Sequence, residues 1–273
     1  MPVLAIGSCM YLKEFFGDVA SPHPCVNCSG SETLDFSVRM AFQPIVDVST
    51  RSIYAYEALV RGENGEGAGE VIARVPPEKL YRFDQTCRVL AIDTAARLGM
   101  GTRLSINFAP NAVYEPATCI RLTLAAAERC GFDPRQLIFE VTESEKIRDV
   151  PHVVRIIKDY QGRGFLTAID DFGAGYAGLN LLAEFQPDLV KLDMALIRGL
   201  DQDRVRRSIT SGIVATCRSL GCDVLAEGVE TVAEYRVLRE MGITRFQGYL
   251  FARPALEALP GIAPALWDTL DAA

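Results

Sequence analysis

The amino-acid sequence predicts an α/β fold, a modified (β/α)8 TIM barrel with an antiparallel first strand. Three observations lead to this prediction. From about residue 38 onward, short runs rich in β-branched and aromatic residues alternate with longer amphipathic segments. Eight short runs follow one another, which is the strand number of this barrel. The first two runs are joined by a turn too short for a parallel crossover. An open, doubly wound sheet is the competing architecture.

The expected elements follow the chain in order. Residues Ser49–Arg51 form the short turn after the first strand, so a β-hairpin opens the barrel. The expected strands are Met40–Val48, Ile53–Val60, Arg103–Phe108, Gln136–Val141, Phe165–Ile169, Leu189–Leu192, Val224–Ala226 and Arg245–Phe251. Helical patterns stand between the later strands, at Tyr81–Leu98, Thr118–Cys130, Val150–Gly162, Asp203–Leu220 and Val232–Met241.

The chain is expected to divide into three parts. Residues 1–37 are interrupted by Pro, Gly and Ser breakers, and they predict an irregular N-terminal arm with a CxxC pair. Residues 38–262 carry the strand–helix alternation without a linker, so they should form one barrel domain. Residues 263–273 are expected to be a C-terminal tail. Within the barrel, Gly62–Gly69 predicts a surface loop.

The composition limits the function. The chain has 273 residues, a net charge of −7 and 49% hydrophobic residues, and this hydrophobic fraction excludes a disordered chain. An acidic chain lacks the basic surface that polymeric nucleic acid requires, so no such partner is expected. No apolar run is long enough for a transmembrane helix or resembles a signal peptide, so we expect a cytoplasmic protein without membrane attachment. With only 2 histidines, carboxylates are the expected catalytic groups.

Four potential metal ligands lie in the N-terminal arm. Cys25 and Cys28 form a CxxC pair, which is half of a typical zinc site, and Cys9 and His23 would supply the other ligands. A strong zinc signal has two close pairs, so a structural Zn²⁺ site and an irregular arm with free thiols both stay open. The remaining cysteines are scattered singly through apolar or helical segments, and we expect reduced thiols there.

Polar side chains stand at the carboxyl ends of most expected strands. They are Glu57, Asn107, Glu140, Asp170, Asp171, Asp193 and Glu227. Barrel enzymes place their chemistry at these ends, so the side chains should converge on one barrel mouth. Buried carboxylates are costly unless they are paired or bind cations, and oxygen ligands suit Mg²⁺ or Mn²⁺. Two such ions typically clamp a phosphoryl group and activate a water, and Lys191 and Arg61 would add positive charge.

The motifs around these residues resemble one known family. Glu57-Ala58-Leu59, followed by Val60-Arg61, is similar to the signature of EAL domains, the cyclic di-GMP phosphodiesterases. The resemblance covers about residues 38–255. It continues through Phe42–Ile45, Phe139–Glu143, Asp170–Tyr176, Lys191–Asp193, Ala226–Glu230 and Gln247–Leu250. The sequence departs from the family pattern at Ala177 and Gly178, where serines are frequent, and after Asn107, where Phe-Ala-Pro follows.

The resemblance implies hydrolysis of cyclic di-GMP to linear pGpG with two Mg²⁺ or Mn²⁺ ions in a barrel whose first strand is antiparallel. It implies that one ion is bound by Glu57, Asn107, Glu140 and Asp170. It implies that the second ion is bound by Asp170, Asp171 and Glu227. Family members often pair through a face near strands five and six, so a homodimer is expected as well.

The resemblance also implies individual roles. Glu57, Lys191 and Glu227 would form the catalytic set. Lys191 would contact the attacking water, and Glu227 would be either a metal ligand or the general base. Substrate binding is expected from Gln43, Arg61, Asp193 and Gln247. Glu143 would anchor the glycine loop at 171–178, although Thr142 and Glu145 also fit a helix capping box.

The predicted function is therefore a metal-dependent cyclic di-GMP phosphodiesterase. A second hypothesis, of another class, is a non-catalytic cyclic di-GMP receptor that acts through a protein partner. A third is an unrelated metal-dependent phosphohydrolase on a similar barrel.

Overall fold

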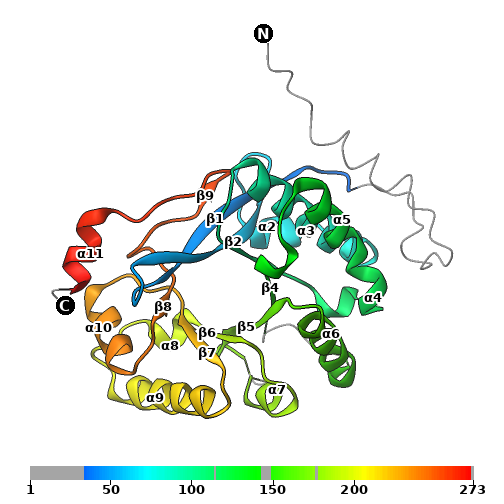
Figure 1. The fold of residues 1–273 in the computed structure, drawn as a ribbon. Helices are drawn as coiled ribbons and strands as arrows, with labels where there is room; N and C mark the ends of the chain where they lie inside the picture. Colours follow the sequence, from blue (N-terminus) through cyan, green and yellow to red (C-terminus); the bar gives the residue numbers. More distant parts are fainter. Residues whose placement is uncertain (1–33, 114, 143–148, 176–177, 272–273) are drawn as a thin grey trace, which may run out of the picture.

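The computed structural model describes residues 34–113, 115–142, 149–175 and 178–271. Eight strands close into a barrel, and helices surround it (Figure 1). The strands are β1 (Val38–Asp47), β2 (Ser52–Gly62), β3 (Arg103–Asn107), β4 (Leu137–Thr142), β5 (Leu166–Phe172), β6 (Leu189–Leu192), β7 (Asp223–Ala226) and β8 (Arg245–Phe246). They pair in chain order from β2 to β8, and β1 pairs with both β8 and β2, which closes the barrel. The predicted (β/α)8 architecture is confirmed.

The first strand runs against both of its barrel neighbours, as predicted from the short turn. β1 is antiparallel to β2 and to β8, whereas the successive pairs from β2 to β8 are parallel. The β1–β2 turn contains Arg51 in a left-handed conformation with φ of 53°, which suits a tight hairpin. A short ninth strand that was not predicted, β9 (Ala255–Leu256), pairs with β1 beside the barrel.

The five predicted helical patterns form the longer barrel helices. They are α3 (Leu80–Arg97), α5 (Arg121–Cys130), α6 (Val150–Gly162), α9 (Arg204–Ser219) and α10 (Val232–Glu240). The shorter helices are α2 (Ala68–Ile72), α4 (Pro116–Cys119), α7 (Gly178–Glu184), α8 (Met194–Ile197) and α11 (Pro264–Asp271), with 3-10 turns at Pro77–Lys79, Pro110–Ala112 and Pro134–Gln136. Asp203 caps α9, and Thr231 and Glu234 form a capping box on α10. No helix within the described ranges combines the length and apolarity needed to cross a bilayer.

The eighth strand is shorter than the predicted run Arg245–Phe251. It stops at Phe246 because the chain turns at Gly248, where φ is 154°. A Cβ on this residue would lie 2.1 Å from the carbonyl oxygen of Val229, so only glycine fits the close approach. The turn leaves Gln247 buried at the barrel mouth.

Residues 264–271 form a helix in the region predicted as a tail. Leu270 of α11 is buried, and Asp271 pairs with Arg51 of the first hairpin at 2.8 Å. These two contacts attach the end of the described chain to the barrel.

The core has two parts. A large cluster fills the space between the sheet and the helices. A smaller buried cluster fills the barrel interior with Ile45, Ala55, Ile138, Ala168, Leu189 and Leu225. Such an apolar layer is typical of a TIM barrel, and it leaves the carboxyl ends of the strands to polar side chains. The five barrel cysteines, Cys87, Cys119, Cys130, Cys217 and Cys222, are free thiols.

Candidate active site

The polar site residues stand two positions beyond the apolar layer on their strands. On β2, Ala55 belongs to the layer and Glu57 follows it. Side chains alternate across a strand, so residues two apart point the same way, here into the barrel. The same spacing pairs Ile138 with Glu140, Ala168 with Asp170, Leu189 with Lys191, and Leu225 with Glu227. On the antiparallel β1 the order is reversed, from Ile45 to Gln43. A polar layer therefore covers the apolar layer at the carboxyl end of the barrel.

The ammonium of Lys191 lies at the centre of this polar layer. Its Nζ is 2.7 Å from Glu227 Oε1, 2.8 Å from Glu140 Oε2, 2.9 Å from Asp170 Oδ1 and 3.6 Å from Glu57 Oε2. Burial alone would lower the pKa of Lys191, but the four carboxylates outweigh this effect and hold the pKa well above its usual value. The buried lysine is therefore a permanent cation.

Carboxamides fix the orientation of Glu57. Asn107 Nδ2 donates to Glu57 Oε1 at 3.1 Å, and Gln247 Nε2 donates to Glu57 Oε2 at 2.7 Å. Gln247 Nε2 also lies 3.2 Å from Gln43 Oε1, and Gln43 Nε2 donates to the carbonyl oxygen of Ala252 at 3.1 Å. The structure thus brings residues from β1, β2, β3 and the segment after β8 together at one carboxylate.

The polar layer carries more negative charge than its lysine neutralises, because four carboxylates face one ammonium. Burial, partly opposed by Lys191, raises the pKa of Glu140 to about 8. Burial and the charge of Asp170 hold the pKa of Glu227 well above its usual value. Burial and the same Asp170 raise the pKa of Asp171 to about 6. Without added cations, protons therefore compensate part of the excess charge near neutral pH.

Two groups of carboxylates lie close enough together that each could hold a metal ion. Within each group, one oxygen per residue lies within 4.8 Å of the others. The groups are Glu57, Glu140 and Asp170, and Asp170, Asp171 and Glu227. Asp170 belongs to both groups, so it could bridge two ions. The donors are oxygens with excess negative charge, and this donor set fits a hard cation such as Mg²⁺ or Mn²⁺.

A break in strand geometry brings two successive aspartates to the same mouth. Neighbouring residues of a regular strand point to opposite faces. Asp171 instead has φ of 55°, and the β5–β6 register shifts between Ile169 and Phe172. The backbone N–H of Asp171 donates to Asp170 Oδ1 at 2.9 Å. The local turn therefore lets Asp170 and Asp171 share the second carboxylate group.

Comparison with known proteins identifies the family. The EAL domain model matches residues 34–254. The chain belongs to the EAL domain family. Among solved structures, a standalone EAL protein from Vibrio cholerae O395 in its c-di-GMP-bound form is 52% identical, with a TM-score of 0.83 over 86% of this chain and 99% of that chain. Klebsiella pneumoniae BlrP1, in a manganese/cy-diGMP complex at pH 6, is 35% identical, with a TM-score of 0.78 over 85% of this chain and 60% of that chain.

This EAL domain is also similar to parts of longer curated proteins. The blue light- and temperature-regulated antirepressor BluF of Escherichia coli K12 is 35% identical over 87% of this chain and 59% of BluF. The cyclic di-GMP phosphodiesterase PdeR of the same organism is 31% identical over 62% of this chain and 25% of PdeR. The chain therefore spans less than two thirds of the length of either relative.

Two of the remaining expected site residues follow members of the polar layer along their chain segments, and the others lie outside the described residues. Arg61 is half-buried at the end of β2, and its Nη1 donates to the carbonyl oxygen of Val60 at 2.8 Å. Asp193 follows β6 and caps α8, because its Oδ1 accepts from the backbone N–H of Ala195 at 2.8 Å. The predicted loop anchor and the four zinc candidates lie outside the described residues: Glu143, Cys9, His23, Cys25 and Cys28.

Sequence reasoning missed one member of the polar layer, Ser105. This fully buried residue donates from Oγ to Glu140 Oε1 at 2.5 Å, while Glu140 Oε2 faces Lys191. Ser105 stands two positions before Asn107 on β3, so the two-residue alternation was the signal that could have found it. Its hydroxyl fixes one oxygen of Glu140.

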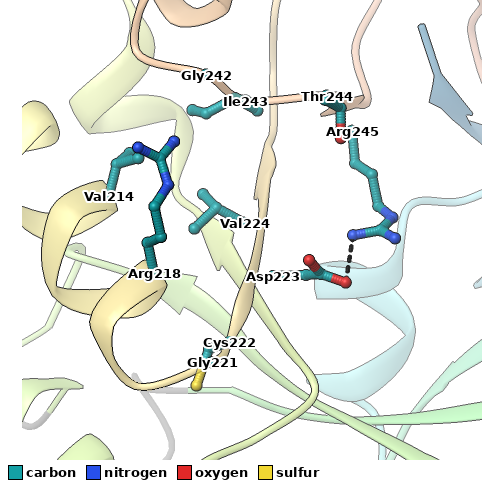
Figure 2. A pocket seen from close by; sticks show the side chains of 10 residues that line it. All are labelled: Val214, Arg218, Gly221, Cys222, Asp223, Val224, Gly242, Ile243, Thr244 and Arg245. Atoms are coloured by element: carbon teal, nitrogen blue, oxygen red, sulfur yellow. Dashed lines mark ion pairs between the residues drawn. The ribbon is translucent and has the colours of Figure 1, made fainter. Parts of the chain in front are cut away.

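A hollow of about 210 Å³ lies at the opposite end of the barrel (Figure 2). It is lined by the amino ends of β7 and β8, where Asp223 and Arg245 form an ion pair at 2.6 Å. Arg218 donates to the carbonyl oxygen of Met241 at 3.1 Å. These arginines therefore have partners within the domain, and the hollow is separate from the carboxylates of the polar layer.

Proposed function

We propose that this EAL domain hydrolyses one phosphodiester bond of cyclic di-GMP and releases linear pGpG, with two Mg²⁺ or Mn²⁺ ions. The observation that carries the proposal is the pair of carboxylate groups that share Asp170 around Lys191. The name of the relative PdeR supports the substrate, and the manganese/cy-diGMP complex of BlrP1 supports both the substrate and the class of ion.

The polar layer would hold the two ions. One would be bound by Glu57, Asn107, Glu140 and Asp170, and the other by Asp170, Asp171 and Glu227. When bound, the ions would lower the pKa of a water and offset charge on the reacting phosphate. Ser105 and Gln247 would keep the carboxylate oxygens oriented toward the ions through the hydrogen bonds described above.

The protein side chains would position the reactants. Lys191 would hold the attacking water and stabilise negative charge as the bond breaks. Glu227 Oε1 lies 2.7 Å from the Nζ of Lys191. From this position Glu227 could act either as an ion ligand or as the base that accepts the proton of the water. Arg61 would pair with a substrate phosphate. Gln43, Gln247 and Asp193 are the proposed contacts for the rest of the dinucleotide.

The direct test is product formation by the purified chain. Incubation with cyclic di-GMP and Mn²⁺ or Mg²⁺ is expected to give linear pGpG, measured by chromatography, and a chelator should stop the reaction. A cyclic dinucleotide with other bases and a simple phosphodiester serve as comparison substrates. Binding of cyclic di-GMP without pGpG formation at any metal concentration would contradict the proposal.

A receptor function is the second candidate, because BluF is named an antirepressor and is 35% identical over 87% of this chain. In that case cyclic di-GMP would change the affinity of this domain for a protein partner and would not be consumed. One titration with cyclic di-GMP distinguishes the two functions. A receptor becomes saturated with intact ligand, whereas a phosphodiesterase consumes the ligand.

Metal binding is expected to depend on pH in a defined direction. The pKa of Glu140 is raised from 4.5 to about 8, so the folded, metal-free protein binds more protons than the unfolded chain between these values. The stability from this proton is complete below about 4.5 and is lost as the pH rises through about 8. Mn²⁺ displaces the proton, so the rise in Tm on adding Mn²⁺ should be larger at pH 8.5 than at pH 6. Equal rises in thermal melts at both values would contradict this coupling.

We propose that the domain forms a homodimer through the helices that follow β5 and β6. Large apolar side chains are exposed there, including Leu179 on α7, Met194 on α8, and Val205 and Ile209 on α9. Protein interfaces bury apolar surface, and these side chains would supply it on this face. The substitution Ile209→Asp is expected to shift the mass in light scattering from dimer to monomer, whereas Ile72→Asp on α2 should not. A monomeric unsubstituted chain would contradict the proposal.

Two expectations for residues outside the described ranges remain proposals. Zinc at Cys9, His23, Cys25 and Cys28 is tested by elemental analysis of the purified chain beside a Cys25→Ser/Cys28→Ser variant. Anchoring of the glycine loop by Glu143 is tested by the effect of Glu143→Gln on turnover at saturating metal.

A further inference from the structure

A buried ion pair lies outside the polar layer, between the barrel and the helices. Asp84 and Arg88 stand one turn apart on α3, and Arg88 Nη2 lies 2.7 Å from Asp84 Oδ2. The side chains are only 4% and 0% exposed. Replacing a buried ion pair with apolar side chains is often neutral or stabilising, so stability alone does not explain why this pair is present.

Asp84 holds the segment that follows β3. Its Oδ1 accepts the backbone N–H of Ala109 at 2.9 Å. One residue earlier, the backbone N–H of Phe108 donates to the carbonyl oxygen of Glu140 at 3.0 Å. The segment directly after Asn107 is therefore held by β4 on one side and by α3 on the other.

Arg88 holds Asp84 and the ring of Phe108. Its Nη1 donates to the hydroxyl of Tyr160 on α6 at 3.1 Å. Its guanidinium lies 5.3 Å from the ring centre of Phe108 and 5.6 Å from that of Phe139, both within cation–π range. The cation is thus fixed by α6 and by two rings, and it fixes the carboxylate of Asp84 in turn.

The segment after β3 borders a hollow on one side, while the ring of Phe108 packs in the core on the other. A hollow of about 320 Å³ is lined by Asn107, Phe108 and Ala109, and by Asp84 on the other side. On the side of the hollow, the hydrogen bond from the N–H of Ala109 to Asp84 ties the backbone of the segment directly to α3.

We propose that Asp84 and Arg88 are positioning residues for Asn107. Asp84 holds the backbone of Ala109, and Arg88 orients Asp84. The carboxamide of Asn107 then stays beside Glu57, where its Nδ2 donates to Glu57 Oε1 at 3.1 Å. The pair sets the affinity of the first ion rather than the rate of the chemical step. This inference rests on the proposed function, because Asn107 is one of the proposed ligands of that ion.

Two double variants isolate the hydrogen bond from the ion pair. Asp84→Asn/Arg88→Met removes both charges but keeps a carbonyl oxygen for the N–H of Ala109. Asp84→Ala/Arg88→Met removes the same charges and also the acceptor. Asp93→Ala is the control on the same helix, because Asp93 pairs with Arg129 at 2.5 Å near the surface. Each protein is titrated with Mn²⁺ alone, and its Tm, kcat and KM for cyclic di-GMP are measured.

The alanine double variant is expected to weaken Mn²⁺ binding by about tenfold or more, with kcat at saturating Mn²⁺ within about threefold of the unsubstituted chain. The asparagine double variant keeps the acceptor but loses the group that orients it, so it should weaken Mn²⁺ binding less than the alanine double variant does. Asp93→Ala should bind Mn²⁺ within about threefold of the unsubstituted chain. A purely structural pair would lower the Tm of both double variants and leave both Mn²⁺ affinities unchanged, and this result would overturn the inference.

A third variant tests the same hydrogen bond from the other side. Ala109→Pro removes the N–H donor at a residue whose φ of −91° is near the proline range, and its ring Cδ takes the place of the hydrogen that points at Asp84 Oδ1, so the carboxylate must move aside. It should weaken Mn²⁺ binding as the alanine double variant does, and it replaces that variant if the latter does not fold. Unchanged Mn²⁺ affinity in Ala109→Pro overturns the inference. If the unsubstituted chain binds Mn²⁺ but forms no pGpG, the proposed hydrolysis fails while the positioning of Asn107 is still measured.

Discussion

Replacing Glu57 with alanine is expected to lower kcat by about 10³-fold or more while the barrel stays folded. The substitution removes a carboxylate from the first group of proposed metal ligands and the acceptor of the hydrogen bonds from Asn107 and Gln247. The loss of these bonds costs stability, but the loss of one negative charge relieves repulsion in a layer with excess negative charge. We therefore expect a change in Tm of the metal-free protein of no more than about 4 °C.

Two further variants serve as comparisons for Glu57→Ala. Glu57→Gln keeps oxygen and amide groups at this position but removes the charge, so it should also lower turnover and Mn²⁺ affinity. Glu63→Ala changes an exposed glutamate just beyond the same strand and should behave as the unsubstituted chain. Turnover is followed as pGpG formation, and folding is followed by thermal melts. Full turnover in Glu57→Ala would remove Glu57 from the site.

The barrel and most of its polar layer could be predicted because they depend on local rules. Barrel enzymes place their functional side chains at the carboxyl ends of the strands, so Glu57 and Glu140 were recognisable from their positions at the ends of their own strands. The short turn at Ser49–Arg51 fixed the direction of the first strand. These features can be predicted without knowing which strands pair with one another.

The contacts between distant strands could not be predicted in the same way. The sequence places Lys191 at a strand end, but its contact with Glu57 exists only because the barrel closes and brings β6 toward β2. Asp84 and Arg88 read as an ordinary i, i+4 pair, which usually lies on the solvent face of a helix. Their burial depends on the packing of α3 against Phe108 and the hydroxyl of Tyr160.

Local changes in backbone direction could not be predicted from the sequence either. Gly248 ends the last strand early because Val229 of the preceding loop approaches it closely, and no pattern in residues 245–251 reports that approach. In the same way, α8 packs directly on the loop after β7, since a Cβ on Gly228 would lie 2.5 Å from Met194 Cβ. The position of Glu227 thus depends on a helix from the preceding unit of the barrel.

Replacing Lys191 with methionine should lower both turnover and the stability of the metal-free protein, unlike the change at Glu57. Methionine has a similar shape but no charge, so four buried carboxylates lose their common cation. Removing one partner of a buried ion pair costs about 3–5 kcal/mol, which corresponds to roughly 10 °C in Tm for a domain of this size. Lys158→Met on the exposed face of α6 is the matched control.

The pH and metal dependence of Lys191→Met separates its two roles. Protons can replace the lost cation at low pH, because Lys191 opposes the rise in the pKa of Glu140 and its loss moves that pKa further up from its value of about 8 in the unsubstituted chain. The loss of Tm should therefore be larger at pH 8.5 than at pH 5.5. Saturating Mn²⁺ supplies positive charge to the same carboxylates and should restore much of the Tm at pH 8.5. It should not restore turnover, because a metal bound by the carboxylates does not replace the ammonium proposed to hold the attacking water. If Mn²⁺ restores both, Lys191 serves only to neutralise the carboxylates, and the water must be held by another group.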